Sequence, residues 1–84
     1  MKIDVEFNGQ EEKTEVTFFL DELKTERDFV VALSIIETFS ADFGLDPELE
    51  PEELVEIGKQ AGEKGGSSFV VEMSEEGIEV DINR

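Results

Sequence analysis

The chain contains no Cys, no His, no Trp and no Tyr. Without Cys it has no disulfide and no thiol nucleophile. Without His it lacks the residue most often used as a general base in catalysis. All the aromatic residues are Phe, seven in number, and Phe is natural core material. These absences predict a protein that is not an enzyme, and a Cys-free chain fits a cytoplasmic, reducing setting.

Positive charge and long apolar runs are also scarce. Seven basic residues face 23 acidic ones, which gives a net charge of −16. Nucleic-acid binding depends on cations that displace counterions from phosphates, so we expect no direct binding to nucleic acid. The longest apolar stretch, residues 29–36, is too short to span a bilayer, and the start of the chain has no apolar signal region. We therefore expect no membrane association, and no motif suggests a cofactor.

High net charge is also typical of disordered chains. Here 38% of the residues are hydrophobic and they follow regular patterns, so we expect a folded protein. Eighty-four residues suit a single domain over 1–84 with one core. A domain of this size is typically stable by about 4–12 kcal/mol.

Two alternating segments open the chain. Residues 2–8 place Ile3, Val5 and Phe7 on one side, which predicts a half-buried strand. Asn8-Gly9 is a turn dipeptide, although the following polar residues allow a longer loop. Residues 14–20 alternate again, and Phe19 is the apolar exception on their polar side. We expect these two strands to form a hairpin.

A helix is predicted from about 26 to 43. Thr25 and Asp28 resemble a capping box, and Gly44 suits the position just past the helix end. Val30 and Val31 lie outside the apolar stripe. They suggest either self-association or cover by a second helix, and we favour cover.

A second helix is predicted to begin at Pro51, with Asp46 as an alternative N-cap. Gly58 and Ala61 are small enough for another element to approach closely, and a run of glycines from Gly62 ends the helix.

Residues 68–74 and 78–83 then form a second hairpin around Glu75-Glu76-Gly77. The order ββααββ predicts an α+β, two-layer fold: a four-stranded, mainly antiparallel sheet with two helices packed on one face. The sequence does not fix the order of the strands.

The outward side of the predicted strands is rich in acid, with Glu15 among its carboxylates. Strand and sheet spacing would array these carboxylates on a rigid support, at a scale comparable with the phosphates of nucleic acid. The alternative is an ordinary solvated sheet face. Phe19 and Val70 are apolar residues on this side that could anchor an interface. The candidate partner-binding residues are Asp4, Glu6, Phe19, Val70, Glu72, Glu79 and Asp81.

A second acidic region runs from Asp42 to Glu56. Carboxylates are ligands for Ca²⁺ or Mg²⁺, but the order here does not match an EF-hand loop, and compensation of helix dipoles explains the region as well. We expect no metal site. Ser67-Ser68 after Gly65-Gly66 lacks the rest of a phosphate-binding loop, so no catalytic residue is proposed.

Three functional hypotheses follow from the charge. The first is a small protein-binding module that mimics nucleic acid and inhibits or modulates a basic, nucleic-acid-binding protein. It predicts carboxylates gathered on one face. The second is a salt-adapted domain whose carboxylates are spread evenly. The third is a structural or oligomeric component that associates through an apolar surface.

Overall fold

The computed structural model describes residues 3–82. The chain folds as an α+β domain, which confirms the predicted class and element order. Its elements are β1 (Ile3–Asn8), β2 (Lys13–Phe19), a 3₁₀ turn (Leu20–Glu22), α1 (Glu26–Ala41), α2 (Pro51–Glu63), β3 (Ser68–Ser74) and β4 (Gly77–Asp81).

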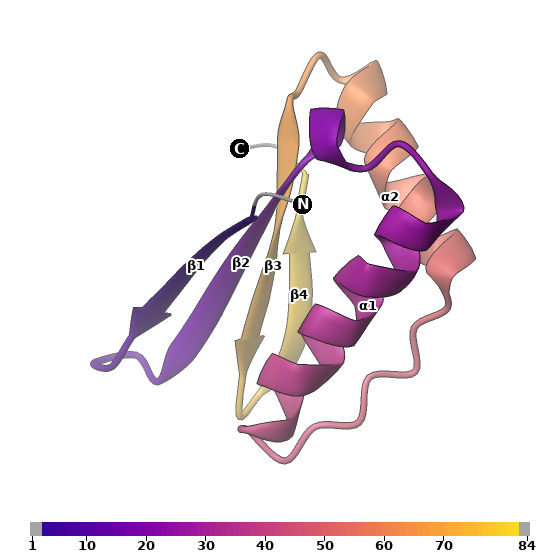
Figure 1. Cartoon of the computed structure of the whole chain (residues 1–84). Helices are drawn as coiled ribbons and strands as arrows, with labels where there is room; N and C mark the ends of the chain where they lie inside the picture. The colour runs from indigo at the N-terminus through magenta and orange to yellow at the C-terminus, as the bar shows by residue number, and fades with distance from the viewer. Residues whose placement is uncertain (1–2, 83–84) are drawn as a thin grey trace.

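The four strands form one antiparallel sheet in the order β1-β2-β3-β4. Both helices lie on the same side of the sheet, as Figure 1 shows. α1 packs on β2 and β3, and α2 packs on β3 and on α1. The two layers therefore meet over the middle of the sheet rather than over its edge at β1. We call the side that faces the helices the inner face and the opposite side the outer face.

The β1–β2 hairpin has a four-residue loop rather than a two-residue turn. Asn8 is still in the strand, where it pairs with Lys13. Its side-chain oxygen accepts hydrogen bonds from the backbone N–H groups of Gln10 (3.1 Å) and Glu11 (3.3 Å). Asn8 thus closes the loop through its side chain.

The predicted capping signals of α1 are both present, although the helix ends at Ala41 rather than at about residue 43. The Thr25 hydroxyl accepts a hydrogen bond from the Asp28 backbone N–H (3.2 Å), and the Asp28 carboxylate accepts one from the Thr25 N–H (2.9 Å). At the other end, Gly44 has a positive φ of 70°, and the Leu45 N–H bonds back to the Ser40 carbonyl at 3.0 Å. This is a Schellman motif, in which the residue just past the helix adopts a left-handed conformation. Gly suits that position because it has no Cβ to clash there.

α2 begins with Pro51 in its first turn, so the alternative start at Asp46 is wrong. The helix approaches its neighbours closely through small residues. A Cβ built at Gly58 would lie 3.8 Å from side-chain atoms of Leu20 and of Phe29, and Ala61 is fully buried. The small residues therefore let α2 pack against the 3₁₀ turn and α1.

The core fills the space between the helices and the two central strands. Phe18 of β2 and Phe69 of β3 sit opposite each other in the register, with ring centroids 5.5 Å apart. Ile36 from α1 and Leu54 from α2 are fully buried in the same cluster. Burial of these apolar side chains is the main source of stability.

β1 departs from the prediction. A half-buried strand was expected, with Val5 and Phe7 on its covered side. The register does place both on the inner face, opposite Val16 and Thr14. They nevertheless remain 44% and 66% exposed, because the helices lie over β2 and β3.

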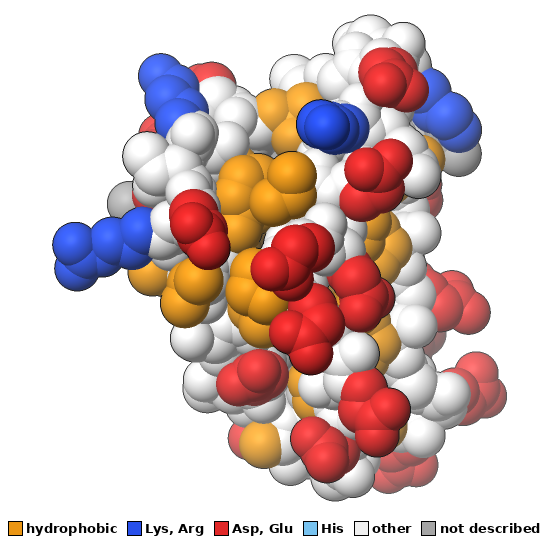
Figure 2. Space-filling model, turned by 90° about the vertical axis from the view of Figure 1, so that its right-hand side faces the viewer, with side chains coloured by type: hydrophobic (Ala, Val, Ile, Leu, Met, Phe, Trp, Pro, Cys, Tyr) orange, Lys and Arg blue, Asp and Glu red, His pale blue; other side chains and the backbone are white. Residues whose placement is uncertain are grey.

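The expected cover over Val30 and Val31 is also wrong. Both side chains are exposed, at 45% and 41%. Figure 2 looks onto the helix side and shows apolar side chains at the surface there, among acidic ones. The reason is that α2 packs elsewhere on α1, near Phe29.

Candidate functional site: the outer face of the sheet

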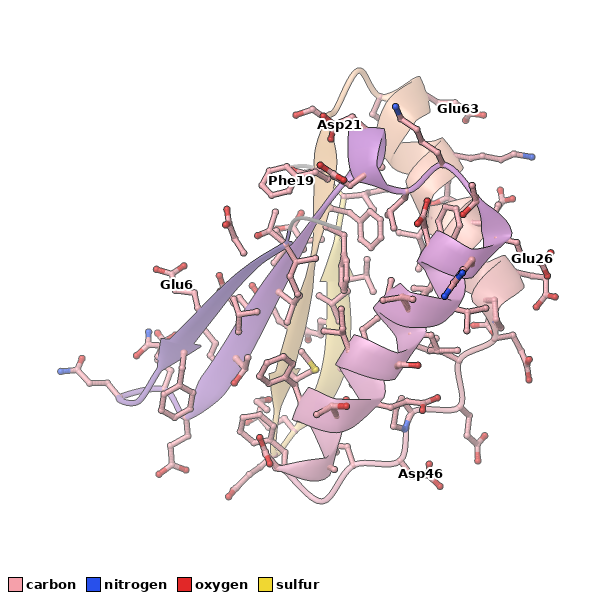
Figure 3. The ribbon with its side chains drawn as sticks, viewed as in Figure 1. Glu6, Phe19, Asp21, Glu26, Asp46 and Glu63 are labelled. Carbon is pink, nitrogen blue, oxygen red and sulfur yellow. The ribbon has the colours of Figure 1, made fainter. Side chains whose placement is uncertain are left out.

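The outer face is formed by alternate residues of all four strands. The register shows which of them lie side by side, because Cα partners on neighbouring strands share a face. All the predicted partner-binding residues lie on this face. Figure 3 shows Glu6 and Phe19 on the side of the sheet away from the helices.

Four glutamates form a continuous row across the sheet. Glu6 pairs with Glu15, Glu15 with Glu72, and Glu72 with Glu79. One glutamate therefore comes from each strand, and we call this row the glutamate rank. With strands about 4.8 Å apart, the rank runs perpendicular to them for about 14 Å. All four were predicted from sequence as outward acids, two on each hairpin, and the pairing of β2 with β3 joins them into one row.

The glutamate rank does not help the sheet to fold. Like charges directly opposite on neighbouring strands destabilise the pair. The rank contains three such pairs. Positive charge brought by another molecule would relieve this repulsion, so the rank is a surface suited to a basic partner.

Lys13 partly compensates the rank at Glu15. Its ammonium group lies 2.9 Å from a Glu11 carboxylate oxygen and 3.3 Å from one of Glu15. These contacts, the Glu11 one foremost, raise the pKa of Lys13. The side chains are partly exposed, so the pairs contribute little to stability. Lys13 sits at the hairpin end of the face, and as a single cation it does not neutralise the four carboxylates of the rank.

A second row lies one step along the strands. It pairs Asp4 with Thr17, Thr17 with Val70 and Val70 with Asp81. Carboxylates therefore stand at both ends, with uncharged residues between them. Val70 is only 4% exposed, so it offers almost no surface to a partner.

Phe19 lies at the end of β2, where it pairs with Ser68. It is half-buried. Asp21 lies two residues further on, in the 3₁₀ turn that follows β2. Phe19 is thus an apolar residue at the border of the acidic face, where it could contact a partner.

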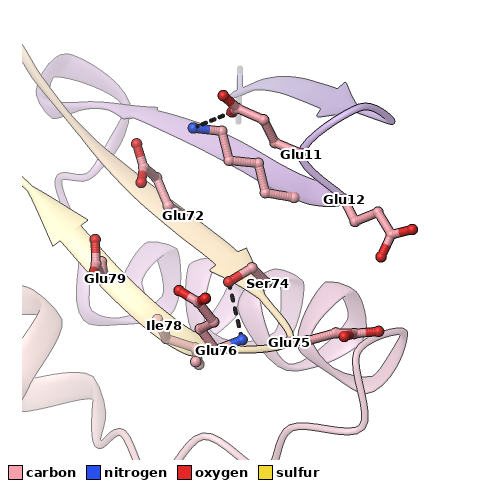
Figure 4. Close-up of a pocket in the computed structure, with 10 residues that line it drawn as sticks. Glu11, Glu12, Glu72, Ser74, Glu75, Glu76, Ile78 and Glu79 are labelled. Carbon is pink, nitrogen blue, oxygen red and sulfur yellow. Dashed lines mark hydrogen bonds and ion pairs between the residues drawn. The ribbon is translucent and has the colours of Figure 1, made fainter.

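A hollow of about 520 Å³ lies at the loop end of the outer face. It lies between the β1–β2 loop and the β3–β4 turn, as Figure 4 shows. Two members of the glutamate rank, Glu72 and Glu79, line it. The loops add further acids that sequence reasoning left out of the site: Glu11, Glu12, Glu75 and Glu76. Their loop positions gave no sign that two separate hairpins would meet here.

Acidic residues are not confined to the outer face. α1, α2 and the connection between them also carry them, and Figure 2 shows red side chains over much of the helix side. The cations are less evenly placed. Among the described residues, Lys13 is the one cation on the sheet, and the others lie in or beside the helices: Lys24, Arg27, Lys59 and Lys64.

Within residues 3–82, no group of three or more acidic side chains is placed to hold a metal ion. No helix in the described part of the chain is long and apolar enough to cross a membrane.

Comparison of the chain with protein-family models, with curated proteins and with solved structures finds no match. The functional argument therefore depends on the geometry of the outer face.

Proposed function

We propose that the chain is a small protein-binding module whose outer sheet face binds a basic, nucleic-acid-binding protein as a mimic of nucleic acid. The observation that carries the proposal is the glutamate rank, in which Glu6, Glu15, Glu72 and Glu79 form one row over four strands. Such a module would inhibit or modulate its partner in the cytoplasm, and it needs no catalytic group and no cofactor.

The arrangement supports this function in two ways. The carboxylates are held on strands, which fix their spacing. Binding therefore costs less conformational entropy than it would for carboxylates on a flexible loop. Residues two apart along a strand lie about 6.6 Å apart, and neighbouring strands about 4.8 Å. Charges at this spacing on a rigid surface resemble a phosphate backbone more than scattered surface acids do.

The test is displacement from DNA. Proteins from a cell extract are bound to a duplex-DNA resin, and the chain is added in solution. We expect the chain to release a defined basic protein, with an efficiency that falls as salt rises. The triple variant Glu6→Gln, Glu72→Gln, Glu79→Gln should be about tenfold weaker.

The matched control removes the same charge from the helix side. Glu37, Glu56 and Glu63 are exposed on α1 and α2, and their triple replacement by Gln leaves the outer face intact. This control should release the protein as well as the original chain does. Equal loss in both triple variants would mean that bulk charge acts, and would contradict a specific face.

A second candidate is a salt-adapted domain whose acidity is global. Acidic residues on the helix side and in the 42–50 connection favour it. It predicts that the melting temperature rises steeply between low and molar salt, as repulsion among carboxylates is screened. An unchanged melting temperature would remove this candidate and leave the binding module.

A further inference from the structure

β1 is an edge strand. Within residues 3–82 it pairs with β2 alone. In an antiparallel pair, alternate residues turn their N–H and C=O groups away from the neighbouring strand. At an edge these groups form a template for another strand.

β1 lacks most of the features that protect edges from pairing. It has six residues, against seven in β2 and β3, so it is not unusually short. It contains no Pro, and its register with β2 runs without a bulge from Ile3 to Asn8. None of its inner-face residues is charged. The one protection left is the charge on its outer face.

The two sides of β1 have different chemistry. On the inner face, Val5 and Phe7 are apolar and exposed, because the helices lie mainly over β2 and β3. On the outer face, Asp4 and Glu6 are exposed acids. A strand that adds here must therefore be apolar on one side and compatible with carboxylates on the other.

Charge makes a second copy of the chain a poor occupant. An antiparallel pairing of two β1 strands centred on Val5 would join the apolar rows of both copies. The same register sets Asp4 of each copy opposite Glu6 of the other, so the glutamate rank of each copy would meet the Asp4 end of the second row of the other. Like charges opposite each other are unfavourable, and both copies carry a net charge of −16.

We propose that the β1 edge binds an extended segment of a partner protein in which basic residues alternate with apolar ones. The segment adds to the sheet as a fifth strand. Its Lys or Arg side chains lie beside Asp4 and Glu6, and its apolar side chains cover Val5 and Phe7. Main-chain hydrogen bonds supply affinity and the alternation supplies specificity. The inference rests on the proposed function in one respect, the basic character of the partner.

The experiment uses labelled synthetic peptides about seven residues long, which matches a strand of this length. One peptide alternates Lys with Val. A second has the same composition with all Lys residues first, so its charge is unchanged and its alternation is lost. We expect the alternating peptide to bind about tenfold more tightly in fluorescence anisotropy, equivalent to about 1.4 kcal/mol. It should also slow hydrogen exchange of β1 amides.

Matched variants test the location. Val5→Thr with Phe7→Thr keeps β-forming residues and removes the apolar row, while Val80→Thr makes a similar change on the other edge strand, β4. The double variant should lose the preference for the alternating peptide, and Val80→Thr should keep it. Retention of the preference in the double variant would overturn the proposal.

The outcomes separate the edge from the outer face. If both peptides bind equally and β1 amides exchange as before, the edge proposal is wrong, whatever DNA displacement shows. If the alternating peptide protects β1 but the chain displaces no protein from DNA, the edge proposal holds and the nucleic-acid mimic is wrong.

Discussion

β1 and β3 both place alternate apolar residues on the inner face, but the surroundings of those residues differ. On β3, Phe69, Val71 and Met73 are fully buried. On β1, Val5 and Phe7 occupy equivalent inner-face positions and are 44% and 66% exposed. Alternation therefore predicts which side of a strand is apolar, whereas the position of the helices decides whether that side is covered.

The two strands belong to parts of the molecule with different roles. The half built from β2, β3 and the helices contains the buried core. β1 contributes one pairing partner to the sheet and little burial, so its apolar side remains available. The stable half can therefore hold the edge strand in place while that edge binds something else.

The largest expected effect comes from truncating the same residue type on the two strands. Phe69→Ala should lower the free energy of unfolding by about 3–5 kcal/mol, because it empties a fully buried site. Phe7→Ala should cost less than about 1 kcal/mol, because the ring is already mostly in water. Urea denaturation measures both. Equal losses of unfolding free energy would mean that the inner face of β1 is covered in solution, and would contradict the difference between the two strands.

A smaller effect is expected when the N-terminal cap of α1 is removed. The helix α1 packs on β3, whereas β1 lies mostly outside its cover. Thr25→Ala removes the hydroxyl that accepts the Asp28 N–H, and should cost about 1 kcal/mol. Hydrogen exchange at β3 amides should then become about fivefold faster, since these amides exchange through global unfolding. Amides of β1 that exchange by local opening should not change. Faster exchange at β1 to the same degree would contradict the division.

The same cap predicts a pH dependence. Backbone N–H groups, that of Thr25 foremost and then that of Lys24, lower the pKa of Asp28 below its usual 3.8. The contribution to stability is therefore complete above that value, and is lost as pH falls through the lower pKa of the folded state. The difference in unfolding free energy between the original chain and Asp28→Asn should shrink only below about pH 4.

The smallest expected effect concerns the charge on β1. Glu6→Lys sets a cation opposite Glu15 in place of an anion, and should stabilise the sheet by about 0.2–1 kcal/mol. A rise of a few degrees in melting temperature would measure it, and molar salt should reduce that rise. Glu37→Lys on α1 makes the same charge change without a cross-strand partner. An equal rise in that variant would show that only net charge matters.

Much of the fold was predictable because its signals are local. Alternation located the strands, the pair Thr25 and Asp28 located the start of α1, and Gly44 its end. The small residues Gly58 and Ala61 indicated the close packing of α2. Each of these features depends on residues within one turn or one strand, so a single sequence is enough to find them.

The remaining features depend on contacts between distant segments. The glutamate rank requires β2 to lie beside β3 in one register, and no local pattern fixes that pairing. The same holds for the exposed side of β1 and for Val30 and Val31, where the expected cover was absent. Sequence placed the acids on the correct face, but their alignment into one row came from the tertiary structure.

The strand order also bears on how the chain folds. β1 with β2 and β3 with β4 are hairpins closed by short loops, and the helices are neighbours in sequence. β2 and β3, in contrast, are separated by residues 20–67, yet they form the centre of the sheet. Closing such a long loop costs entropy before any contact compensates for it. We therefore expect the central pairing to form late and to limit the folding rate, after each hairpin has formed locally.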